Sequence, residues 1–88
     1  MILILEKRRL ITEIDQIVCD SECIIAYPSN NDLPICIADK KPFQDKSYMI
    51  NIPGTSKIKY WYEASLEEKF DFIQDNLVKH GNIIRLAI

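Results

Sequence analysis

The best-defined element in the sequence is an amphipathic helix over residues 65–80. Ser65 is followed three residues later by Glu68, and this spacing forms a capping box that satisfies free donors of a first helical turn. Apolar side chains then recur at the three- and four-residue spacing of one helix face: Leu66, Phe70, Ile73 and Leu77. Gly81, directly after His80, suits the left-handed position that ends a helix.

A β-hairpin is predicted immediately before this helix. Residues 47–52 and 57–63 both alternate between apolar and polar side chains, which is the period of a half-buried strand. Pro53 and Gly54 between them suit the two central positions of a type II turn. We expect the core-facing side chains of the second run to be Ile58, Tyr60 and Tyr62. The opposite face then carries Lys57, Lys59 and Trp61.

The first half of the chain contains further strand patterns and a second helix pattern. Residues 10–18 have the apolar spacing of an amphipathic helix, through Leu10, Ile11, Ile14, Ile17 and Val18. Residues 2–5 form either a short strand or the start of that helix. Strands are predicted over residues 22–27, 33–38 and 82–88, and Pro34 favours an edge position for the second of these.

Together these patterns predict an α+β fold. Residues 1–88 are enough for one compact domain and leave no room for a second. We expect a single, mostly antiparallel β-sheet of four to six strands with two amphipathic helices packed on one face.

Composition and charge exclude several classes of protein. The net charge is −2 and the pI about 5.3, whereas nucleic-acid-binding domains are usually basic. The longest apolar run, residues 1–5, is too short to span a membrane or to act as a signal peptide, so we expect a cytoplasmic protein. Cys19, Cys23 and Cys36 do not match a disulfide framework or a zinc module, and we expect small buried apolar thiols.

The sequence contains little that could support catalysis. Its single histidine, His80, falls where a helix end favours a cation. The chain has two glycines, both needed for turns, so a glycine-rich phosphate loop is absent. We therefore expect no enzymatic activity, no cofactor and no bound metal.

The predicted function is that of a small protein-binding module. An inhibitor, an immunity factor or a regulatory subunit would block a larger protein target through one of two surfaces. One surface is the acidic outer face of the last helix, with Glu67, Asp71 and Asp75. The other is the hairpin face with Lys57, Lys59 and Trp61, because exposed tryptophans are common at the centre of protein interfaces.

Other interpretations stay open at this point. The Lys57, Lys59 and Trp61 face could instead bind RNA or single-stranded DNA by stacking and phosphate contacts. Trp61 could also be buried, under the 39–46 connection or against Phe43, and would then contact no partner. A small ribonuclease-type enzyme is a weaker alternative, and the apolar last strand leaves a homodimer as open as a monomer.

Overall fold

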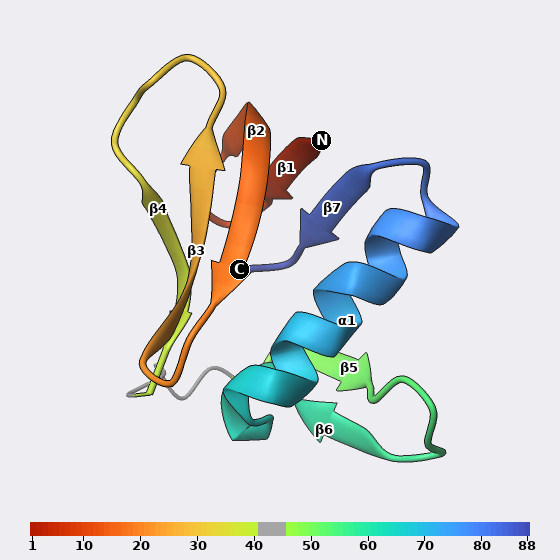
Figure 1. Ribbon diagram of the computed structural model, residues 1–88. Coiled ribbons are helices and arrows are strands. Elements are labelled where there is room, and N and C mark those ends of the chain that lie inside the picture. The colour runs from red at the N-terminus through yellow and green to blue at the C-terminus, as the bar shows by residue number, and fades with distance from the viewer. Residues whose placement is uncertain (41–45) are drawn as a thin grey trace.

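The computed structural model describes residues 1–40 and 46–88 and has an α+β architecture (Figure 1). Across its five-stranded sheet the strands are β4 (Ile35–Asp39), β3 (Cys23–Pro28), β2 (Leu10–Cys19), β1 (Ile2–Leu5) and β7 (Ile83–Leu86). A separate two-stranded sheet contains β5 (Met49–Asn51) and β6 (Ile58–Tyr60). A short 3-10 helix, η1 (Trp61–Glu63), leads towards α1 (Leu66–Lys79). The predicted single sheet is therefore wrong, because the hairpin forms its own sheet.

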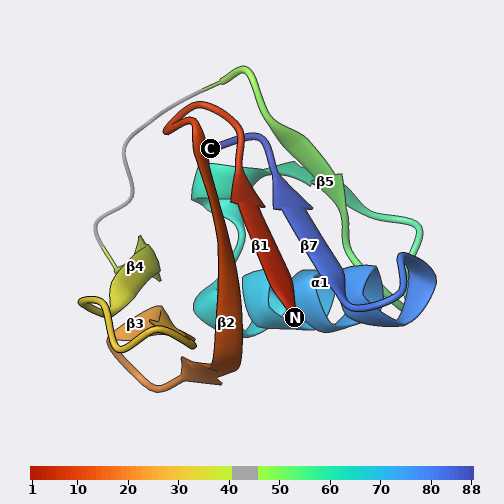
Figure 2. The same ribbon diagram turned by 90° about the horizontal axis from the view of Figure 1, so that it is seen from above.

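The strand pairings make the large sheet mixed. The pairs β1–β2, β2–β3 and β3–β4 are antiparallel, whereas β7 runs parallel to β1. Figure 2 shows β1 and β7 side by side and pointing in the same direction, with α1 lying across one side of them. The chain thus returns at its end to pair with its first strand, and α1 is part of the connection that this parallel pairing requires.

The second helix expected over residues 10–18 is wrong, because these residues form β2. A β-bulge between Ile14 and Gln16 changes the register of β2 against β3. Before the bulge, Leu10 and Ile14 pack into the core, and after it Ile17 does, so the apolar residues that face inward are four and then three positions apart. This spacing imitates a helix. Residues 2–5, for which the sequence allowed either a strand or the start of this helix, form the strand β1.

One side of the sheet and α1 together enclose a continuous apolar core. Leu3, Leu5, Ile84 and Leu86 are fully buried from β1 and β7, and Ile73 is fully buried from α1. The alternate residues of the same strands point to the other side of the sheet. The core is therefore covered by a single α-helix among the described residues, rather than by the two that the sequence predicted.

The predicted ends of α1 are confirmed. The Ser65 hydroxyl accepts from the Glu68 N–H, and the Glu68 carboxylate accepts from the Ser65 N–H, both at 3.0 Å. His80 is the C-cap residue, and Gly81 follows in the left-handed region with φ of 62°. Within the described ranges, no helix has the length and apolar character needed to cross a membrane.

Candidate functional site

Trp61, which the sequence placed on an exposed face, is buried. Only 7% of its surface is accessible, because the chain leaves the strand geometry after β6 and η1 begins at this residue. Its ring stacks on Tyr48 at a centroid distance of 5.7 Å and meets Phe72 edge-on at 6.3 Å. The buried alternative is therefore the one observed for Trp61, whereas the suggested contact with Phe43 lies outside the described residues.

The rest of the predicted hairpin face is also arranged differently. Ile58, expected in the core, is 59% exposed, so the predicted orientation of this strand is wrong. Lys59 is half-buried and binds both carboxylate oxygens of Glu68 at 3.0 Å. Lys57 is exposed. The three residues predicted to act together thus have three different environments.

The acidic residues of α1 do share one side of the helix. Glu67 and Asp71 are exposed, and Asp75 is half-buried and pairs with Lys79 at 2.9 Å. The acidic residues in the first half of the chain do not extend this face onto a second helix, because Glu13 and Asp15 lie on β2 and Asp20 and Glu22 lie beside it. The Asp20 carboxylate, for example, accepts from the backbone N–H groups of Glu22 and Cys23.

The cysteines and acidic groups give no indication of a metal site. Cys19 and Cys23 are partly buried and Cys36 is exposed, so the expectation of small buried thiols holds only in part. Within residues 1–40 and 46–88, no group of three or more side chains has the geometry to hold a metal ion.

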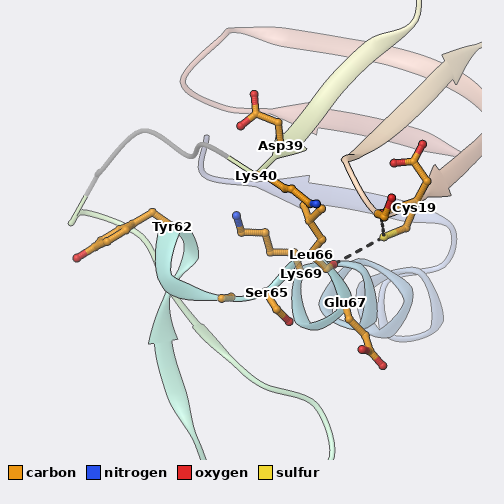
Figure 3. Close-up of a pocket in the computed structure, with 11 residues that line it drawn as sticks. Cys19, Asp39, Lys40, Tyr62, Ser65, Leu66, Glu67 and Lys69 are labelled. Atoms are coloured by element: carbon orange, nitrogen blue, oxygen red, sulfur yellow. Dashed lines mark hydrogen bonds between the residues drawn. The ribbon is translucent and has the colours of Figure 1, made fainter.

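A pocket of about 430 Å³ opens beside the first turn of α1, between this helix and the ends of β2 and β4 (Figure 3). This volume lies within the range of small-molecule sites, about 300–1,000 Å³. The lining includes apolar, polar and charged side chains: Cys19, Asp39, Lys40, Tyr62, Ala64, Ser65, Leu66, Glu67 and Lys69.

Lys69 is the most unusual residue of this pocket. Its side chain is 1% exposed, and its amine lies 5.3 Å from the centre of the Trp61 ring. Burial lowers the pKa of Lys69, and the nearby Asp39 carboxylate opposes this change only in part. No carboxylate of the described residues lies within ion-pair distance of the amine. A buried charged group without an ion-pair partner is costly, and such groups gather at functional sites.

The sequence does contain a signal for this burial, in the spacing of Lys69 from the apolar residues of the helix. Lys69 comes three residues after Leu66 and four before Ile73, so helix geometry places it on the same side as the apolar stripe.

The Cys19 thiol also lies at this pocket, where it donates a weak hydrogen bond of 3.9 Å to the carbonyl oxygen of Leu66. Burial raises the pKa of Cys19, which keeps this thiol protonated at neutral pH.

A second pocket, of about 530 Å³, lies along the outer edge of β7. We call it the β7 groove. It is bounded by residues from the end of β1, the segment before β5, the end of α1 and β7 itself: Glu6, Tyr48, Asn76, His80, Ile83, Arg85 and Ala87. Burial raises the pKa of the Tyr48 hydroxyl, which also forms a hydrogen bond with the Ala87 backbone.

Backbone groups of β7 face this groove. The carbonyls of Asn82 and Leu86 accept from the N–H groups of Ile2 in β1 and of Glu6 directly after β1, so alternate residues along β7 direct their backbone towards that strand. Ile83 and Arg85 therefore direct their N–H and C=O groups away from the sheet, and no described residue pairs with them. At the opposite edge, the Arg8 guanidinium donates to the carbonyl of Cys36 in β4 at 2.9 Å, which partly blocks that strand.

The side of the sheet away from α1 is apolar next to β7. Ile2 lies beside Ile83, and Ile4 lies beside Ile11 in the strand register. The exposed fractions of Ile2, Ile83 and Ile11 are 36%, 38% and 74%. We call Ile2, Ile4, Ile11 and Ile83 the isoleucine face, and it adjoins the free edge of β7.

Comparisons of this chain with models of protein families, with curated proteins and with solved structures found no match. The features of the described residues that could receive a ligand or a partner are the pocket beside the first turn of α1, the β7 groove and the isoleucine face.

Proposed function

We propose that the protein is a small non-enzymatic binding module that receives an extended segment of a partner protein along β7. The observation that carries this proposal is the outward direction of the unpaired backbone groups of Ile83 and Arg85, into a groove of about 530 Å³. An added strand would satisfy these groups by continuing the sheet. An inhibitor, an immunity factor or a regulatory subunit could act in this way by engaging a segment that its target needs.

The side chains around the groove indicate the chemistry of the partner segment. A strand beside β7 places alternate side chains next to the isoleucine face, where apolar residues would cover Ile83. The Arg85 side chain is 67% exposed, and its contact with the Glu6 carboxylate is long at 3.9 Å. A segment with alternating apolar residues and an acidic residue opposite Arg85 fits both features.

The two surfaces predicted from the sequence differ in how much of each is available to a partner. The acidic face of α1, with Glu67 and Asp71 exposed, remains a second candidate contact with a basic partner. Nucleic-acid binding through the hairpin is a weaker alternative, because a Trp61 ring packed on Tyr48 offers no free surface for base stacking. Lys57 is the remaining exposed member of that surface.

A pair of variants at one position tests strand addition. Arg85→Pro removes the outward N–H, which is not used by the pairing with β1, and Arg85→Ala keeps this N–H while removing the charge. Both tagged variants and the wild-type protein are used for affinity capture from nuclease-treated lysate of the source organism. We expect a stoichiometric partner that Arg85→Ala retains and Arg85→Pro loses.

The other results are equally informative. If Arg85→Pro retains the partner, the β7 edge is not the contact. Loss of this partner in a double variant with Glu67→Lys and Asp71→Lys would then assign the contact to the acidic face of α1. Recovery of nucleic acid from untreated lysate, with loss on Lys57→Glu, would favour the nucleic-acid alternative. Thermal unfolding of each variant verifies that lost binding does not reflect lost folding.

A further inference from the structure

We propose that the pocket beside the first turn of α1 binds a small organic carboxylate, with the Lys69 ammonium group as its counter-ion. This site is separate from the β7 groove, and the proposal does not depend on strand addition. Three features carry it: a buried amine without an ion-pair partner among residues 1–40 and 46–88, backbone donors that have no acceptor in these ranges, and the charge and polarity of the walls.

The position of the Lys69 amine is the first feature. Figure 3 shows this side chain running from α1 into the space between Tyr62 and Asp39. The amine lies over the Trp61 ring, 5.3 Å from its centre, which stabilises a cation but supplies no negative charge. Asp39 influences Lys69 without forming an ion pair with it, and in Figure 3 its carboxylate points away from the amine. An anion in the pocket would complete the environment of this amine.

The first turn of α1 supplies additional donors. Within this turn the Glu68 N–H binds the Ser65 hydroxyl, and the Lys69 N–H binds the Ser65 carbonyl. The N–H groups of Leu66 and Glu67 have no acceptor among the described residues. Free N–H groups and the positive end of the helix dipole favour an anion at this end, where Ser65, Leu66 and Glu67 line the pocket.

The charges of the walls select for a singly charged ligand. The residues that line the pocket include the acidic Asp20, Asp39 and Glu67 and the basic Lys40 and Lys69, so acidic residues outnumber basic ones around it. In Figure 3 the Glu67 carboxylate points away from the pocket. A doubly charged phosphate would be repelled more strongly by these carboxylates than a carboxylate would be.

Apolar wall atoms determine which carboxylates fit. Ala64 is buried, Leu66 is half-buried, and the Cys19 thiol packs near the Leu66 backbone. These groups favour a short hydrocarbon tail on the acid. Burial of two additional methylene groups corresponds to about tenfold tighter binding of butyrate than of acetate.

The fluorescence of Trp61 provides a direct test, because it is the single tryptophan of the chain and contacts the Lys69 amine. The protein is titrated with butyrate, acetate, inorganic phosphate and the uncharged butyramide at constant ionic strength. We expect saturable binding of butyrate, about tenfold weaker binding of acetate, and none of butyramide. Equal binding of phosphate or butyramide, or no saturable response to butyrate, would overturn the proposal.

Variants and NMR separate the site from non-specific effects. Lys69→Met should weaken butyrate binding at least tenfold, whereas Lys79→Met, which changes an exposed lysine of the same helix, should leave it unchanged. Wild-type affinity in Lys69→Met contradicts the proposal. If this variant does not fold, the Lys69 side-chain methylene signals of the wild-type protein report the same interaction. Butyrate should raise the pKa of Lys69, and an unchanged pKa contradicts a direct contact.

Discussion

The amine of Lys69 lies 5.3 Å from the centre of the Trp61 ring, with the lysine 1% exposed and the tryptophan 7% exposed. The pair joins α1 to η1, so it connects the main core to the segment that follows the hairpin. A cation over an aromatic ring recovers part of the free energy that burial of the amine costs. The remaining cost makes the stability of the protein depend on pH.

Lys69→Met is expected to raise the free energy of unfolding by about 1 kcal/mol at pH 7, because it replaces a buried amine with an apolar side chain of similar length. Burial lowers the pKa of Lys69 below the ordinary value of 10.5, so the unfolded chain binds more protons between the lowered and the ordinary pKa. The contribution of Lys69 to stability therefore rises with pH across that window. The advantage of Lys69→Met should shrink between pH 7 and 10 in urea unfolding experiments. A constant advantage would contradict this explanation.

The capping box of α1 should contribute measurably to stability. Ser65→Ala removes the acceptor of the Glu68 N–H and should lower the free energy of unfolding by about 1 kcal/mol. Hydrogen bonds from the Ser65 backbone and from Lys59 lower the pKa of Glu68 in the folded protein. Its contribution is present above the ordinary pKa of 4.5 and is lost as the pH falls through the lowered value.

Glu68→Gln should remove this acid sensitivity, as followed by thermal unfolding at several pH values between neutral and acidic conditions. Glu67→Gln is the matched control, since Glu67 is exposed in the same helical turn and takes no part in the capping box. An equal loss of acid sensitivity in both variants would contradict the role assigned to Glu68.

Two neighbouring residues of β7 should differ strongly in their effect on stability. Ile84 is fully buried against α1, whereas Ile83 is 38% exposed on the isoleucine face. Ile84→Ala should lower the free energy of unfolding by about 3 kcal/mol, and Ile83→Ala by less than about 1 kcal/mol. Chemical denaturation measures both, and similar losses would show that the orientation of β7 is wrong.

Trp61→Ala should destabilise the protein rather than remove a surface contact. Loss of the ring that packs on Tyr48 and Phe72 should lower the free energy of unfolding by about 3–5 kcal/mol. The wild-type protein should show blue-shifted tryptophan emission that is resistant to quenching by acrylamide. Lys57→Glu, at an exposed residue, serves as the control and should change stability by less than about 0.5 kcal/mol. Emission at the wavelength of a solvated indole would contradict the burial.

The elements that depend on local interactions were predictable from the sequence. The helix that begins after Ser65 follows from its cap and apolar spacing, and the turn at Pro53 and Gly54 follows from backbone preferences. Gly54 has φ of 77°, and the Thr55 N–H binds the Ile52 carbonyl, as a type II turn requires. These features need no knowledge of distant contacts.

The errors arose where distant pairing overrode local pattern. The bulge after Ile14 is fixed by the pairing of β2 with β3. It gives the apolar residues of this strand the spacing that is typical of a helix. Trp61 is buried rather than exposed because η1, and not a strand, begins at this residue. This backbone turn packs the Trp61 ring against Tyr48 and Phe72. The two pockets and the free edge of β7 depend on the strand order, which the sequence did not specify.

The parallel pairing of β1 with β7 also affects the order of events during synthesis. β1 emerges from the ribosome well before β7, one of its two neighbours, because β7 is translated after α1. Until then, the N-terminal strands can form their antiparallel pairs, while the core side of Leu3 and Leu5 stays uncovered. Contacts between residues so far apart in sequence slow folding and prolong the exposure of apolar strands. The nascent chain therefore has a period of vulnerability to aggregation that ends only when β7 becomes available to pair with β1.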